Sequence, residues 1–154
     1  MNYAPSTRQR IADLKMGIRV NRATANMATT VPLFHIYVGR VLMNLILGEV
    51  TEVLETKVSN TKLVLDPVEA GTTNDLCATA DFSDLHVGTL ITIAGVAGTA
   101  IQTTKASETV RGQDVPVVLA VGDIEPSMSA TLTGSIKWSM WYVPLDKGAY
   151  VLAV

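Results

Sequence analysis

Residues 135–154 read SIKWSMWYVPLDKGAYVLAV, and the pattern of this stretch indicates the fold class. Successive side chains of a β-strand point to opposite faces of the sheet. Trp138, Met140 and Tyr142 therefore share one face, which can fill a core. The segment PLDKG, residues 144–148, has the composition of a turn, so we expect a hairpin in which AYVLAV pairs with the preceding strand.

The opposite face of the same strand carries Trp141 and Val143 beside Lys137 and Ser139. A single sandwich has one core, so two large apolar side chains on the outer face need another cover. One interpretation is that the N-terminal region or a loop half covers Trp141. We favour the other, a contact between subunits, and take Trp141 and Val143 as partner-binding residues.

The segments before this stretch also have the pattern of short strands. In LFHIYV, residues 33–38, apolar side chains alternate with His35 and Tyr37. The run at residues 41–53 fits either a helix or a strand, and we favour a strand with a bulge or bend near Gly48, because β-branched residues and glycine recur and no helix cap precedes the run. Further short apolar runs are separated by Gly, Pro, Asn and Asp. This spacing predicts an antiparallel β-sandwich or a jelly-roll-like barrel over residues 33–154.

The composition favours a subunit of an assembly. Hydrophobic residues make up 48% of the 154 residues and charged residues only 17%, which leaves little charge to coat an isolated surface. A large core is the alternative explanation. Cys77, as a single cysteine, excludes an intramolecular disulfide, and its apolar neighbours indicate a buried structural thiol. The apolar run at residues 31–47 is interrupted by polar side chains, so no membrane span is expected.

Residues 1–32 differ from the body and are interpreted as an N-terminal arm. Residues 1–22 hold five basic residues against one acidic residue, a net charge of +4, whereas residues 23–154 hold seven basic and thirteen acidic residues, a net charge of −6. Ile11, Leu14 and Ile18 have helical spacing, which predicts a short amphipathic helix.

We expect this arm to order against an adjacent chain. Its basic side chains would face an acidic surface, while the apolar stripe would dock in a groove. The partner-binding residues expected in the arm are Arg8, Arg10, Ile11, Leu14, Ile18, Arg19 and Arg22. Nucleic acid is not the expected partner, because the charges are spaced out and no aromatic side chains interleave with them. A plain solvated face is the alternative.

The sequence does not predict catalysis, a metal or another cofactor. His35 and His86 stand outside any cluster with ligand spacing, and no phosphate-binding or nucleophile motif occurs. Glu49 and Glu52 could form an acid/base site with Asp123 and Glu125 only if folding brought these carboxylates together. We interpret the two glutamates as part of a solvated strand face.

Several segments resemble small structural proteins encoded in tailed-bacteriophage virion gene clusters. The resemblance rests on the strand that runs into GEVTEV, the segment SNTKL, the strand GTLITIAG and the ending WSMWYVPLDKGA. It covers roughly residues 33–154 and leaves the arm outside.

The resemblance implies a virion component without catalytic activity. Its closest form is a head decoration (cement) protein, made in the host cytoplasm and placed on the capsid surface. The implied partners are further copies of the chain, as a homotrimer or homodimer, and the major capsid protein, with no small-molecule substrate. A tail or connector protein of the virion is the first alternative, and a soluble β-sandwich ligand-binding module is the second.

Overall fold

Strands β3 (Val41–Glu52) and β11 (Ser135–Pro144) form the centre of one sheet, sheet A, and pair antiparallel along ten register positions. Strand β1 flanks β11, while β7 and β9 pair with β3 and β8 pairs with β7. The bounds of these flanking strands are Ile18–Ala25 for β1, Leu90–Thr92 for β7, Gln102–Thr103 for β8 and Val117–Leu119 for β9. The computed structural model describes residues 16–69, 71–104 and 108–154.

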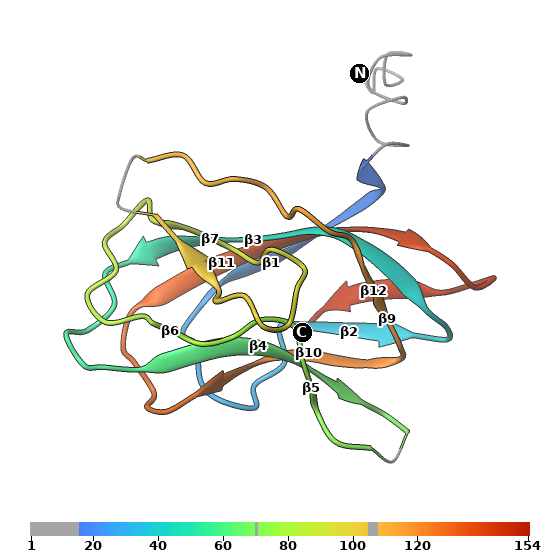
Figure 1. Ribbon diagram of the computed structural model, residues 1–154, viewed down its shortest axis with the longest axis horizontal. Coiled ribbons are helices and arrows are strands. Elements are labelled where there is room, and N and C mark those ends of the chain that lie inside the picture. Colours follow the sequence, from blue (N-terminus) through green and yellow to red (C-terminus); the bar gives the residue numbers. More distant parts are fainter. Residues whose placement is uncertain (1–15, 70, 105–107) are drawn as a thin grey trace.

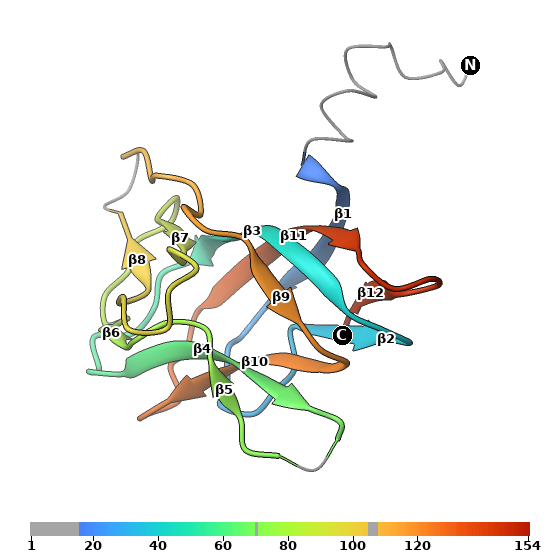
Figure 2. The same ribbon diagram turned by 45° about the vertical axis from the view of Figure 1, so that its right-hand side comes forward.

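The second sheet, sheet B, is built around β10 (Gly122–Met128), which pairs with β4 on one side and β2 on the other. Strand β12 pairs with β2, while β5 and β6 pair with β4. The bounds of these strands are Phe34–Tyr37 for β2, Asn60–Pro67 for β4, Asn74–Asp75 for β5, Ala80–Asp81 for β6 and Tyr150–Ala153 for β12. Figures 1 and 2 show the two sheets stacked, which confirms the predicted all-β sandwich.

The core lies between the two sheets and is formed by the inward side chains of both. On β11 the predicted inward face is confirmed, because Trp138, Met140 and Tyr142 are all buried. Strand β3 alternates buried and half-buried side chains, which decides between the helix and strand interpretations of this run. Cys77 is buried and accepts a hydrogen bond from the main-chain N–H of Leu63, and burial raises the pKa of its thiol.

Strand β1 corrects the interpretation of residues 18–25 as part of an arm that needs an adjacent chain to order. These residues pair antiparallel with β11 of their own chain, with Ile18 opposite Tyr142 and Arg19 opposite Trp141. Ile18 therefore lies in a strand and not in the predicted helix, whose other residues lie outside the described part of the chain. That residues 1–15 form an arm stays a prediction, because they lie outside the described residues.

The predicted hairpin between residues 135–144 and AYVLAV is also wrong. The turn forms, but β11 belongs to sheet A and β12 pairs with β2 in sheet B, so this connection crosses the sandwich. The hydroxyl of Tyr142 instead accepts a hydrogen bond from the main-chain N–H of Val151 across the core. A turn of this length suits either connection, and the pairing of β12 with β2, which places Val151 in the core from sheet B, decides between them.

The bulge expected at Gly48 lies elsewhere. Gly48 pairs regularly with Trp138 on β11, and the register shifts occur between Ser135 and Ile136 and between Trp141 and Tyr142. A Cβ atom at Gly48 would lie 2.9 Å from the ring of Trp138. The glycine is therefore there to make room for the buried indole.

One end of the sandwich is fastened by Arg40 and Asp146. The main-chain N–H of Arg40 and its guanidinium both donate to the carboxylate of Asp146, which joins the β2–β3 turn to the β11–β12 turn. These hydrogen bonds lower the pKa of Asp146 to about 2. Val38, two residues before Arg40, has a φ of 72° and an exposed side chain, so it does not continue the alternation of buried apolar side chains expected over residues 33–38.

Candidate interaction surfaces

The outer face of sheet A carries a row of half-buried apolar side chains at its centre. We call this row the apolar face, and its residues are Leu42, Leu45, Leu47, Trp141 and Val143. Adjacent strands bring them together, since Trp141 lies opposite Leu45 and Val143 lies opposite Leu42. Trp141 and Val143, which were expected to be exposed, are half-buried. Strand β1 runs beside Trp141, with Arg19 opposite it, and covers part of the indole.

The apolar face continues onto strand β9. Val118 lies opposite Leu42 and is 56% exposed. Lys137 and Glu49 close the row at its other end, where their charged groups lie 3.0 Å apart. Such an arrangement of apolar centre and charged border is typical of protein–protein contacts.

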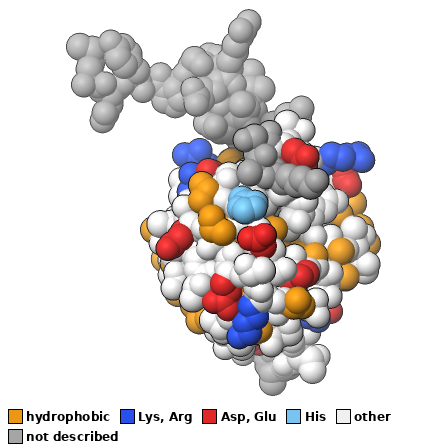
Figure 3. All heavy atoms as spheres, turned by 90° about the vertical axis from the view of Figure 1, so that its left-hand side faces the viewer, with side chains coloured by type: hydrophobic (Ala, Val, Ile, Leu, Met, Phe, Trp, Pro, Cys, Tyr) orange, Lys and Arg blue, Asp and Glu red, His pale blue; other side chains and the backbone are white. Residues whose placement is uncertain are grey.

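Exposed apolar side chains are also frequent beyond this row. Valine dominates the set, and many of its members lie in turns and loops, which suggests interaction surfaces at several places on the molecule. The exposed valines are Val31, Val38, Val53, Val58, Val68, Val87, Val96, Val115, Val118 and Val154. Figure 3 shows one end of the sandwich, where hydrophobic, acidic and basic side chains are interspersed.

The expected partner-binding residues of the arm fall into two groups. Ile18 and Arg19 lie on β1 and are exposed. Arg22 is half-buried, and its Nε donates to the main-chain oxygen of Val154, so this arginine is engaged within the chain. The remaining expected residues, Arg8, Arg10, Ile11 and Leu14, lie outside the described residues.

The outer face of sheet B carries carboxylates that the sequence does not group. We call Asp66, Asp123 and Glu125 the acidic cluster. Asp123 lies directly opposite Asp66 on the neighbouring strand, and Glu125 follows two residues later on the same face of β10. His35 on β2 lies on the other side of Asp123, with its Nδ1 2.5 Å from the carboxylate.

Glu125 is the most unusual member of the acidic cluster. Its side chain is 6% exposed, and no described residue donates a hydrogen bond to its carboxylate. Burial raises the pKa of Glu125, and the negative charges of Asp66 and Asp123 raise it further. The carboxylate oxygens of Glu125 are not among the fully buried polar atoms without a partner, which in the described part of the chain belong to Arg22, Gln113 and Trp138.

Aromatic rings border the acidic cluster. The rings of His35 and Tyr37 lie with centroids 4.1 Å apart, and those of Tyr37 and Tyr150 are stacked at 5.0 Å. The three side chains come from β2 and β12 and share the outer face of sheet B. On the outer face of sheet B, the aromatic rings on β2 and β12 therefore lie beside the acidic cluster on β4 and β10.

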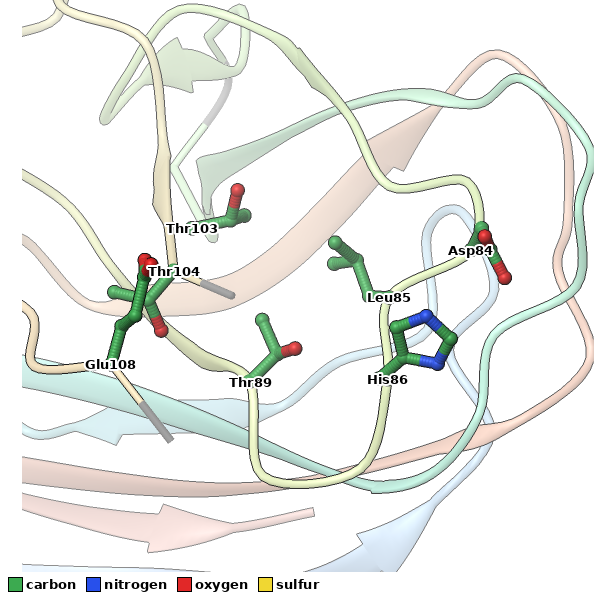
Figure 4. A pocket seen from close by; sticks show the side chains of 7 residues that line it. All are labelled: Asp84, Leu85, His86, Thr89, Thr103, Thr104 and Glu108. Atoms are coloured by element: carbon green, nitrogen blue, oxygen red, sulfur yellow. The ribbon is translucent and has the colours of Figure 1, made fainter. Parts of the chain in front are cut away.

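An open cleft of about 660 Å³ lies at the β7–β8 end of the sandwich. Figure 4 shows Glu108 and Thr104 on one side of this cleft and His86 and Asp84 on the other, with Thr89 between them. Their polar groups do not converge on one point. The hydroxyl of Thr104 accepts a hydrogen bond from a main-chain N–H, which is a structural role.

The carboxylates that could have formed an acid/base site are kept apart by the fold. Glu49 and Glu52 lie on β3 of sheet A, whereas Asp123 and Glu125 lie on β10 of sheet B. Within the described residues no group of three His, Cys, Asp or Glu side chains is arranged to hold a metal ion. The sequence analysis did not predict the acidic cluster, because its residues come from β4 and β10, which are distant in sequence.

Comparisons with protein-family models, with characterised proteins and with solved structures give no significant match. Over the described ranges no helix is long and apolar enough to cross a membrane. The chain is thus defined by its architecture, an all-β sandwich of two antiparallel sheets with candidate contact surfaces on both outer faces.

Proposed function

We propose that this chain is a structural subunit of a tailed-bacteriophage virion, and specifically a decoration (cement) protein that binds the head shell. The observation that carries the proposal is the apolar face, where Leu45 and Trp141 lie half-buried on the outside of a complete sandwich. The family resemblance at GEVTEV, SNTKL and the WSMWYVPLDKGA ending supplies the virion context.

The physical basis of attachment is the burial of apolar surface. Each square ångström of apolar surface removed from water contributes about 25 cal/mol before the costs of association. A stable interface buries about 800 Å² on each partner, which is more than one row of five side chains supplies. The proposal therefore includes two kinds of contact, one with further copies as a homotrimer or homodimer and one with the major capsid protein.

The self-association part is tested with Leu45→Lys in the full chain. The long charged side chain would place a cation in the middle of the apolar face, while Val58→Lys changes an exposed loop valine and serves as the matched control. We expect sedimentation at micromolar concentration to show an oligomer for the unchanged chain and the control, and dissociation for Leu45→Lys. A monomer in all three would contradict self-association through this face.

The virion part needs a separate measurement. Particles purified from cells that carry the gene for this chain are analysed by quantitative mass spectrometry and cryo-electron microscopy. We expect the chain in the particles, in a fixed ratio to the major capsid protein and as density outside the shell. Density on the tail or at the head–tail joint would support the tail or connector alternative, and absence from the particles would overturn the proposal.

The alternative of a saccharide-binding module has less support from the surface. Sugars stack on the exposed faces of aromatic rings, but the faces of Tyr37 are directed at His35 and Tyr150. The ring faces of Tyr37 are therefore taken by its two neighbours, and Tyr150, which is 41% exposed, has one face against Tyr37.

A further inference from the structure

The end of the sandwich that Arg40 and Asp146 fasten carries two exposed apolar side chains. Val38 is 68% exposed in the β2–β3 turn, and Leu145 is 47% exposed in the β11–β12 turn. Hydrogen bonds join the two turns, and Figures 1 and 2 show them side by side. We call these two turns, residues 38–40 and 145–148, the tip.

The conformation of Val38 is costly for the isolated chain. The main-chain N–H of Gly39 donates to the main-chain oxygen of Tyr37, which closes a three-residue turn around Val38 at a φ of 72°. Such turns are rare and strained, and a β-branched residue seldom adopts this φ. The valine side chain buries little surface in return. Strained residues of this kind gather at binding sites, where the surrounding structure holds them in place.

The surroundings of Val38 hold the tip in one conformation. The carboxylate of Asp146 accepts hydrogen bonds from the main chain and the guanidinium of Arg40, and the main-chain oxygen of Arg40 accepts from the N–H groups of Leu145 and Asp146. A Cβ atom at Gly39 would lie 2.6 Å from the Cβ atom of Asp146, so glycine lets the two turns approach. A contact surface that is fixed before binding loses little conformational entropy when it binds.

The open cleft lies at the opposite end of the sandwich. Strand β3 begins at Val41, directly after the tip, and the end of β3 and the residues after it hydrogen-bond to the loop that carries the cleft. There the main-chain N–H of Gly88 donates to Val50, and that of Leu54 donates to Leu85. The twelve residues of β3 separate the two ends by about 35 Å, so the tip and the cleft cannot meet within one chain.

The lining of the cleft is apolar in the middle and acidic at its sides. Figure 4 shows Leu85 between Asp84 on one side and Glu108 on the other. The lining also includes three threonines, whose methyl groups add apolar surface, and these are Thr89, Thr103 and Thr104. With His86 neutral, the lining residues carry a net charge of −2.

The tip has the opposite charge. Arg40 and Lys147 against Asp146 give the two turns a net charge of +1. The side chain of Arg40 is still 63% exposed in its ion pair with Asp146, and Lys147 is exposed. Opposite charges on two surfaces favour their encounter and set their orientation. The tip and the cleft therefore match in polarity and in charge.

We propose that the tip of one copy of the chain docks in the open cleft of a second copy. Val38 and Leu145 would pack on Leu85 and the threonine methyl groups, with Lys147 toward the acidic sides. Because the tip and the cleft are different surfaces at opposite ends, this contact is heterologous and joins copies head to tail. The inference goes beyond the proposed function, since it adds a contact that needs neither the apolar face nor a capsid protein.

The test isolates this contact in the full chain with Leu45→Lys, which removes association through the apolar face. Sedimentation equilibrium is run at concentrations about a hundredfold above the micromolar range, because small interfaces are weak. Val38→Asn removes the apolar side chain of the tip, and Val58→Asn is the control at another exposed valine. Thr103→Arg fills the cleft and places a cation in it, and Thr99→Arg is the control at an exposed threonine.

We expect the Leu45→Lys chain and both controls to self-associate, and Val38→Asn and Thr103→Arg each to raise the dissociation constant about fivefold or more. Val38→Ile keeps a branched apolar side chain and should keep the association. Val38→Asn should at the same time raise the melting temperature, because it relieves strain. Weaker association of a more stable chain is a result that a purely structural role of Val38 would not produce.

Two further measurements locate the contact in the cleft. A mixture of Val38→Asn chains and Thr103→Arg chains should associate more tightly than either alone, because the first supply an intact cleft and the second an intact tip. Asp84→Asn removes one acidic group and keeps a residue that tolerates the φ of 55° at this position. It should weaken association at low salt and have little effect at high salt.

Three results would overturn the proposal. These are no association of the Leu45→Lys chain at high concentration, dissociation constants of the tip and cleft variants equal to those of their controls, and a mixture no tighter than its components. A loss confined to Val38→Asn, with Thr103→Arg and Asp84→Asn unaffected, would show that the tip binds another surface and would equally contradict the cleft. Particles that contain the chain in the separate virion measurement would leave the proposed function standing in each case.

Discussion

Arg22 Nε donates a hydrogen bond of 2.9 Å to the main-chain oxygen of Val154, which joins an edge strand of sheet A to the end of an edge strand of sheet B. Strands β1 and β12 lie against each other at this side of the sandwich. The main-chain N–H of Val154 in turn donates to Leu33. Burial around this contact lowers the pKa of Arg22, so the guanidinium is partly removed from water while it holds the two edges together.

Arg22→Ala should lower the free energy of unfolding by about 1–2 kcal/mol, because it removes a charged donor and the packing of the side-chain stem. Arg19→Ala is the matched control on the same strand, where the side chain is exposed, and it should change stability by less than about 0.5 kcal/mol. Urea unfolding measures both. Equal effects of the two substitutions would show that Arg22 does not fasten the edges.

Gly48→Ala should destabilise the chain by about 2 kcal/mol, since the new methyl group would lie 2.9 Å from the ring of Trp138, which is buried in the core. Gly98→Ala is the control, because nothing lies within 4 Å of a Cβ atom there. Thermal unfolding followed by near-ultraviolet circular dichroism reports on both stability and the environment of the indole. An unchanged transition for Gly48→Ala would argue against this close contact.

Val38→Asn should raise the free energy of unfolding by about 1 kcal/mol. A β-branched residue at a φ of 72° is strained, asparagine tolerates this conformation, and the valine side chain is 68% exposed and buries little. Val58→Asn replaces another exposed valine outside such a turn and should be close to neutral. Chemical denaturation compares the two, and a loss of stability in Val38→Asn would mean that the valine makes contacts that outweigh its strain.

Glu125→Gln should stabilise the chain at pH 7 and lose this effect in acid. The folded state raises the pKa of Glu125 above its usual value of 4.5, so the charged carboxylate opposes folding and stability falls as the pH rises above about 4.5. We expect a higher melting temperature than that of the unchanged chain at pH 7 and the same melting temperature below pH 4. Glu69→Gln, at an exposed glutamate, is the control. A gain that is constant from pH 3 to 8 would exclude the ionisation of Glu125 as its cause.

The strands with one buried face could be predicted from sequence because their apolar side chains alternate. This holds for β2 and β11, and for β3 once the run is interpreted as a strand with a period of two residues. Strand β1 was missed for a physical reason. It is an edge strand whose sequence, IRVNRATA, leaves most side chains exposed, so hydrophobic alternation is weak even though six of its residues pair with β11.

The candidate contact surfaces could be predicted only where they are local in sequence. Trp141 and Val143 follow from alternation within one strand. The acidic cluster could not be predicted, because Asp66 and Asp123 become neighbours only through the register of β4 and β10. The sequence also could not predict that β12 joins sheet B, since the composition of a short turn does not specify which sheet the next strand joins.

The pairing of β1 with β11 also determines when the fold can be completed. Asn21 and Ser139, which lie opposite each other in these strands, are 118 residues apart along the chain. During synthesis β1 has no partner until β11, more than a hundred residues further along the chain, has left the ribosome, so sheet A closes only after translation of its last strand. Contacts between such distant residues slow folding, and the edge of β11 that β1 covers is the last to be shielded from neighbouring chains.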